Sequence, residues 1–284
     1  MADSDPEALR AELLERWERA ASGWGRRAPH MREFGMPVST WMIEHAGLQP
    51  GQRVLELAAG PGETGLLAAE LIRPGGVLIS SDAAESMLDV ARARARELGI
   101  ENVEFRRLEL EWIDLPTAGV DVVMCRWAVM LIVDPEAALR ESRRVLVPGG
   151  RMVLAVWDQP ELNPWAAIID RVLVELGHAP PPDPSAPGMF ALAAPGRLHE
   201  LLEGAGFVEV LVESLELPRA PMTAQELIAE RLDLSRLFAE TYERLSGDER
   251  EAIERRIASV GAPYADADGR LVLPGRALVA AATA

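Results

Sequence analysis

Residues 54–65 are Val54-Leu55-Glu56-Leu57-Ala58-Ala59-Gly60-Pro61-Gly62-Glu63-Thr64-Gly65. This stretch predicts a strand that ends in a glycine-rich turn and continues into a helix. Such a turn lets the backbone approach a nucleotide-like ligand with no side chain between them. Asp82 follows a second apolar run, Val77-Leu78-Ile79, twenty-two residues after Gly60. A carboxylate at the tip of a second parallel strand suits the hydroxyls of a ribose, so we expect an adenosine-containing cofactor.

The surroundings of the turn indicate which cofactor this is. Residues 60–65 fit the pattern G-x-G-x-x-G, which nicotinamide and flavin sites also use. However, Glu56 lies inside the first strand, where a carboxylate can receive a cationic amine, and Glu63 in the loop would repel a pyrophosphate. S-adenosyl-L-methionine (SAM) has an ammonium and a ribose but no phosphate, so we expect SAM. A nicotinamide-dependent oxidoreductase remains as an alternative.

Several motifs in order carry a family resemblance. They are residues 56–62, Asp82, the run Asp121-Val122-Val123-Met124-Cys125-Arg126, residues 134–139 and residues 144–150. Residues 53–157 thereby resemble the class I SAM-dependent methyltransferases. They are most similar to the small-molecule branch that includes the ubiquinone/menaquinone C-methyltransferases and natural-product methyltransferases.

The resemblance implies a set of cofactor-binding residues: Trp24, Glu56, Ala58, Gly60, Gly62, Asp82, Met87, Glu109, Leu110, Glu111 and Arg126. Asp82 is expected to hold the ribose, and Glu56 with the backbone of residues 58–62 to hold the methionine end. Trp24 lies in a segment that resembles one where an aromatic ring closes over SAM.

Three of these assignments leave a question open. Ala58 stands where the family usually has its first glycine, which is tolerable if this residue needs no positive φ. The acid that faces the adenine is either Glu109 or Glu111. Arg126 either pairs with the cofactor carboxylate or the acceptor, or forms a structural ion pair with Asp121 or Asp134.

Methyl transfer is an in-line displacement that needs aligned reactants in a dry pocket. Large apolar residues that would line such a pocket are Met31, Phe34, Trp127, Met130 and Trp165. Each alone is typical of a core, but their position on loops above the strand ends favours a pocket for a small, largely apolar or aromatic acceptor. A SAM-binding protein without transferase activity is a second alternative, since the reaction has no obligatory catalytic side chain.

His30 is the candidate catalytic base, because histidine titrates near neutral pH. The competing interpretation is a solvated loop histidine beside Arg26, Arg27 and Arg32. His30, His45, His178 and His199 show no metal-ligand spacing, and Cys125 is the only cysteine, so we expect no metal.

Strand and helix patterns alternate along the chain. Strands are expected at residues 53–58, 77–81, 103–107, 120–125 and 151–157, with helices near 65–72, 84–98 and 135–146. This alternation predicts a parallel sheet with right-handed crossovers, whose ligands bind at the carboxyl ends of the strands. Glu56, Asp82 and Arg126 would then share one rim.

The remaining elements complete the predicted fold. Helices are expected at residues 6–22, 37–46 and 197–205, a strand at 208–217, and a last strand near 276–282. The prediction is an α/β fold with a doubly wound, mostly parallel seven-stranded sheet, as in Rossmann-like methyltransferases. Residues 1–284 would form one domain, with N-terminal lid helices in 1–48, a SAM-binding core in 50–218 and 270–284, and an inserted helical cap in 221–262.

Composition narrows the class of protein. The formal net charge of −16 disfavours nucleic acid as a partner. Every cation in the chain except histidine is arginine, and the absence of lysine excludes a Schiff-base or P-loop lysine. The chain has no apolar run near 18 residues, which predicts no membrane span. We expect a cytoplasmic enzyme, monomeric or homodimeric, that acts on a small molecule.

Overall fold

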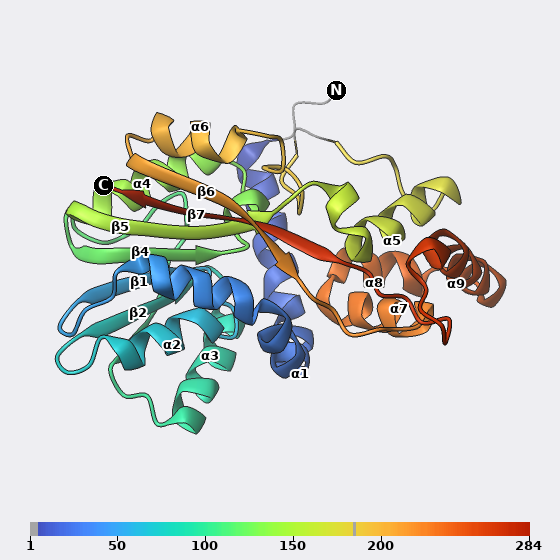
Figure 1. The fold of residues 1–284 in the computed structure, drawn as a ribbon, viewed down its shortest axis with the longest axis horizontal. Helices are drawn as coiled ribbons and strands as arrows, with labels where there is room; N and C mark the ends of the chain where they lie inside the picture. Colours follow the sequence, from blue (N-terminus) through green and yellow to red (C-terminus); the bar gives the residue numbers. More distant parts are fainter. Residues whose placement is uncertain (1–4, 184–185) are drawn as a thin grey trace.

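The computed structural model describes residues 5–183 and 186–284 and contains a seven-stranded sheet (Figure 1). The strands are β1 (Arg53–Leu57), β2 (Val77–Asp82), β3 (Val103–Arg107), β4 (Val120–Arg126), β5 (Leu146–Trp157), β6 (Val208–Leu217) and β7 (Gly275–Thr283). Their order is β3-β2-β1-β4-β5-β7-β6. Only β7 runs antiparallel to its two neighbours, so β6 is parallel to β1–β5. The predicted sheet and its C-terminal strand are confirmed.

Helices flank the sheet as the alternation predicted. They are α2 (Glu63–Leu71), α3 (Glu85–Leu98), α4 (Pro135–Val145) and α6 (Arg197–Gly204), with short 3₁₀ turns at Val129–Leu131, Pro160–Leu162 and Ala262–Tyr264. The central strands are buried on both sides, as their near-continuous apolar sequences require.

One long helix replaces the two N-terminal helices that we expected. Helix α1 spans Pro6–Ala46 and contains Pro29 and Pro37. A proline inside a helix removes one hydrogen bond and usually ends it, which is why the sequence predicted a new start at Pro37. The helix continues because Phe34, on one side of Pro37, and Met42, on the other, are both buried in the core, and this packing offsets the lost bond.

Helix α1 crosses the carboxyl ends of the strands and lies between the sheet and a second group of helices (Figure 1). That group contains α7 (Ala224–Leu234), α8 (Arg236–Glu243) and α9 (Gly247–Gly261), which occupy the segment expected to be a cap. Capping boxes at Thr223 and Ser246 begin α7 and α9. Helix α5 (Pro164–Glu175), which the sequence analysis did not predict, packs against α9.

A single hydrophobic cluster contains buried residues of α1, the sheet, α5 and α7–α9. The division of the chain into lid, core and cap within one domain stays a prediction. Within residues 5–183 and 186–284, no helix is long and apolar enough to cross a membrane.

Candidate functional site

The loop after β1 and the tip of β2 are tied together by Asp82. One carboxylate oxygen of Asp82 accepts a hydrogen bond from Gly60 N–H at 2.9 Å, and the other accepts from Ala84 N–H at 2.9 Å. Burial raises the pKa of this carboxyl. Gly60 and Gly62 have φ values of 53° and 81°, which favour glycine, and a Cβ on Gly60 would meet no atom within 4 Å. The loop therefore presents bare backbone to open space beside a buried carboxylate.

Ala58 adopts a backbone conformation that the sequence analysis did not expect. Its φ is 49°, in the left-handed region. The condition under which alanine would be tolerable at position 58, that this residue needs no positive φ, is therefore not met. A left-handed alanine costs roughly 1–2 kcal/mol relative to the ordinary helical conformation, and glycine avoids this cost. The chain carries this strain at the start of the glycine-rich turn, where strain is often associated with a functional site.

Glu56 is a buried carboxylate beneath the same turn. It accepts hydrogen bonds from Gly65 N–H at 2.6 Å and from the Ser80 hydroxyl at 3.4 Å. Among the described residues, no basic side chain forms an ion pair with it. Burial raises its pKa to about 7, because water no longer stabilises the charged form. A Cβ on Gly65 would overlap the Glu56 carboxylate, so this glycine is required by close packing.

The first half of α1 lies against the start of α3, next to Asp82. Glu18 accepts hydrogen bonds from Glu85 N–H at 2.9 Å and Ser86 N–H at 3.0 Å, and so caps α3 from α1. Trp24 and Met87, two predicted cofactor residues, pack in one small apolar cluster here. The Trp24 indole N–H donates to the Leu234 carbonyl at 3.2 Å, which ties this ring to the end of α7.

The middle of α1 contacts the loop and β4. Arg32 forms an ion pair with Glu63 at the start of α2. The Ser39 hydroxyl lies 2.9 Å from that of Thr64 and 3.3 Å from Nη1 of Arg126. Arg126 forms no ion pair with Asp121 or Asp134 in the described structure, so that structural alternative is wrong. Burial lowers the pKa of Arg126, and the neighbouring Glu56 opposes this effect.

The two candidate adenine acids differ in their partners. Glu111 is ion-paired with Arg10 of α1 at 2.6 Å and also accepts a hydrogen bond from Asp134 N–H at 2.5 Å. Glu109 is exposed and forms no ion pair within the described part of the chain. Leu110, between them, is buried.

Four aromatic side chains meet at the carboxyl ends of β4 and β5. The ring of Phe34 of α1 stacks on those of Trp127 and Trp157, at centroid distances of 6.1 and 5.9 Å. The centroids of Trp127 and Trp157 are 4.3 Å apart. Trp165 of α5 contacts Phe34 and Trp157 edge-on. We call these four residues the aromatic cluster. Trp127 has a φ of 60°, a strained conformation for so large a residue. Met31 and Met130 are buried in the same hydrophobic core.

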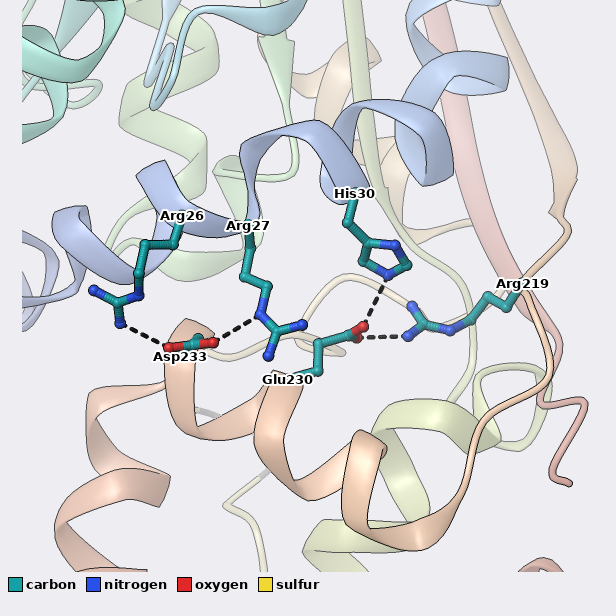
Figure 2. A network of polar contacts seen from close by, with 6 residues as sticks. All are labelled: Arg26, Arg27, His30, Arg219, Glu230 and Asp233. Atoms are coloured by element: carbon teal, nitrogen blue, oxygen red, sulfur yellow. Dashed lines mark hydrogen bonds and ion pairs between the residues drawn. The ribbon is translucent and has the colours of Figure 1, made fainter.

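His30 belongs to a network that joins α1 to α7 (Figure 2). Its Nε2 atom lies 2.9 Å from Glu230, and the other oxygen of Glu230 accepts from Arg219 at 2.5 Å. Arg26 and Arg27 both pair with Asp233, each at 2.7 Å. The alternative of a loop histidine is wrong, since His30 is helical and paired with a carboxylate.

Arg219 and Glu230 were not predicted as site residues from the sequence. Both side chains are almost fully buried, and the Arg219 guanidinium carbon lies 4.6 Å from the ring centroids of Phe34 and Trp165. A signal for Arg219 was present, because it follows β6, which ends at the same rim as the other parallel strands. The rule that selected Arg126, at the end of β4, would also have selected Arg219.

Among the described residues, no group of three or more His, Cys, Asp or Glu side chains is arranged to hold a metal ion. The side chains around the turn fit SAM instead. Asp82 and Glu56 are acceptors suited to a ribose and an ammonium, and the approach to Gly60 is unobstructed.

Comparisons with known proteins indicate the family of this chain. Residues 48–175 match the family model of a methyltransferase domain. The nocamycin O-methyltransferase of Saccharothrix syringae is 33% identical over 207 residues, which cover 69% of this chain and 73% of that protein. The ubiquinone/menaquinone biosynthesis C-methyltransferase UbiE of Shewanella oneidensis is 29% identical over 182 residues, 60% of this chain and 72% of that protein.

The fold agrees as well. The crystal structure of the YcgJ protein of Bacillus subtilis superposes with a TM-score of 0.59 at 21% identity, and the match covers 86% of this chain and 97% of that one. The expectation of SAM is confirmed, and the nicotinamide alternative is set aside. Together, the turn, the sheet order and the relatives show that this chain belongs to the class I SAM-dependent methyltransferases.

Proposed function

We propose that the protein transfers the methyl group of SAM to a small, largely apolar or aromatic acceptor by in-line displacement in a desolvated pocket. The observation that carries this proposal is the aromatic cluster at the carboxyl ends of β4 and β5, which includes Phe34 of α1; β4 is the sheet neighbour of β1, the strand that leads into the turn at residues 58–62. Aromatic faces bind planar apolar molecules and exclude water from the reacting atoms.

The proposed cofactor contacts follow from the geometry of the turn. Asp82 would hold the ribose hydroxyls, and Glu56 with the loop backbone would hold the ammonium end of the methionine. Glu109 is the better adenine partner, because the carboxylate of Glu111 is already bound to Arg10 and the Asp134 N–H. Trp24 and Met87 would cover the adenosine from α1 and α3, where they pack together.

The bound cofactor supplies an electrophilic methyl group on a sulfonium. The residues of the chain have three tasks: to align the acceptor, to keep water out, and to remove a proton where the acceptor must lose one. Phe34, Trp127 and Trp165 would serve the first two. Met31 and Met130 are proposed to extend the apolar lining.

His30 is the proposed base. In its neutral form, Nε2–H donates to Glu230, which leaves Nδ1 as the proton acceptor. A carboxylate that holds one ring nitrogen fixes the tautomer and the orientation of the ring, as in other histidine-carboxylate pairs. The acidic charge of the chain, −16, supports a small molecule rather than a nucleic acid as acceptor. The proposal includes a cytoplasmic enzyme that is a monomer or homodimer.

A mass-spectrometric assay tests the proposal. The protein is incubated with SAM and a metabolite extract, and products that gain one methyl group are sought. Trp157→Leu should reduce turnover at least tenfold while SAM still binds, because the ring stacks within the proposed pocket. Trp112→Leu is the matched control, since Trp112 is 76% exposed and should be neutral. SAM binding without any methylated product, or methylation of a protein or nucleic acid instead, would refute the acceptor class.

A further inference from the structure

Arg219 is a buried cation with unused hydrogen-bond donors. Its side chain is only 2% exposed, and its Nη2 atom donates to Glu230 at 2.5 Å. Its Nε and Nη1 atoms are buried and have no acceptor among the described residues. The guanidinium lies on the faces of Phe34 and Trp165, so these unused donors are at the edge of the aromatic cluster.

Unused donors of this kind are uncommon in a folded protein. A buried N–H without an acceptor has lost its bonds to water and gained nothing in return. Cation–π contact with two rings stabilises the charge of Arg219, but it does not satisfy N–H groups that lie in the guanidinium plane. Such groups are therefore candidates for contact with a ligand.

A second unused donor lies in the same cluster. The indole Nε1 of Trp127 is buried and has no acceptor in the described structure. Trp127 stacks on Phe34, the ring that also carries Arg219, and Arg126 lies 4.8 Å from the Trp127 ring centroid. The cluster thus offers free donors and two guanidinium groups. Glu230, the carboxylate that contacts Arg219, is already shared between His30 and Arg219.

A flat molecule with an electron-rich oxygen would complement the aromatic rings and the free N–H donors. We propose that Arg219 determines specificity for the acceptor, which is an aromatic or conjugated molecule bearing an anionic oxygen such as a carboxylate. The rings bind the apolar plane, and the free N–H groups of Arg219 bind the oxygen through charge-assisted hydrogen bonds. This inference rests on the proposed function, because it places the acceptor in the aromatic cluster.

A pair of probes of equal shape tests the inference. Calorimetry measures the binding of naphthalene-2-carboxylate and of naphthalene-2-carboxamide to the full chain saturated with S-adenosylhomocysteine. The wild type should bind the carboxylate about tenfold or more tightly than the carboxamide, as expected for a charge-assisted bond in a dry site. In Arg219→Gln this ratio should fall to near one, and in Arg219→Lys it should be intermediate, since the charge remains.

The ratio separates recognition from a structural role. Loosening of the cluster in a variant would weaken both probes alike and leave the ratio unchanged. Arg231→Gln is the matched control, because Arg231 also has a buried, unpartnered Nε and an acidic partner, Asp170, but stacks on no aromatic ring among the described residues. Its ratio should equal that of the wild type.

Three outcomes overturn the inference: equal affinities in the wild type, no binding of the carboxylate at millimolar concentration, or an unchanged ratio in Arg219→Gln. If Arg219→Gln fails to fold, the ratio of carboxylate to carboxamide affinity in Arg219→Lys decides instead, and a ratio equal to that of the wild type overturns the inference. Failure of S-adenosylhomocysteine to bind would instead refute the proposed function, so the two failures are distinct.

Discussion

The cofactor region and the aromatic cluster are built in different ways. Residues 56–87 form the turn, Asp82 and the start of α3 within one short stretch of chain, and backbone hydrogen bonds to two carboxylates hold them together. The aromatic cluster and Arg219 combine side chains from α1, the ends of β4 and β5, α5 and the segment after β6, which span residues 34–219: Phe34, Trp127, Trp157, Trp165 and Arg219. Ring stacking and a few buried ion pairs hold this second region together.

The difference has a physical meaning. A site made of backbone and local contacts suits a ligand that never changes, because its geometry depends on few side chains. A site made of side chains from distant elements can change its shape by substitution without loss of the fold. Four substitutions, given in order of decreasing expected effect, test whether the two regions are separable in this way.

Glu56→Gln should have the largest effect, and it should depend on pH. The pKa of Glu56 is raised to about 7 in the folded protein from an ordinary value of 4.5. Between these two values the folded chain binds more protons than the unfolded chain, so stability falls as pH rises. The wild type should lose about 3 kcal/mol relative to the variant between pH 4.5 and 7, and no more above it.

Urea unfolding at a series of pH values measures this difference, with Glu109→Gln as the control that removes an exposed carboxylate. A difference between wild type and Glu56→Gln that does not vary with pH would mean that Glu56 stays charged. The turn would then hold the Glu56 carboxylate in a more polar environment than its burial indicates.

His30→Ala tests the second region and should slow methyl transfer roughly 10²-fold if His30 is the base. SAM affinity, measured by calorimetry, should change little, because His30 contacts Glu230 and not the turn. Arg27→Ala is the control, since it removes another contact between α1 and α7 without removing a base. Equal loss of turnover in both variants would assign His30 to fastening α1 rather than to proton transfer.

Asp82→Ala should weaken SAM binding by about 1–3 kcal/mol through the loss of charge-assisted hydrogen bonds. The loop also loses the acceptor for Gly60 N–H, so Asp82→Asn is a useful companion that keeps an oxygen in place. Calorimetry would contradict the ribose assignment if both variants bound SAM as the wild type does.

Ala58→Gly should have the smallest effect. Glycine relieves the positive φ of 49°, and the gain in folding stability should be about 1 kcal/mol or less, since glycine also loses more entropy on folding. Thermal unfolding measures it. A destabilised Ala58→Gly protein would indicate that the methyl group of Ala58 contributes packing that exceeds the strain.

The sequence predicted the sheet well because each strand is a short apolar run between turn signals, and β3 and β6 match their expected bounds. It did not predict a continuous α1, since local rules for proline gave no weight to the burial of Phe34 and Met42. It placed Glu56, Asp82 and Arg126 on the rim from strand order alone. It missed Arg219 because the same rule was not extended to β6, and it missed Glu230 because nothing in a helix sequence shows which carboxylate will be buried.

The two prolines of α1 also determine where this helix bends most easily. Pro29 cannot donate to the carbonyl of Gly25, nor Pro37 to that of Glu33, so the backbone is under-bonded at two places eight residues apart. Helix α1 therefore bends most easily at Pro29 and Pro37, and the segment between these prolines carries Arg32 and Phe34. Bending at these two prolines would shift together the contact of Arg32 with Glu63 at the start of α2 and the contacts of Phe34 with the aromatic rings.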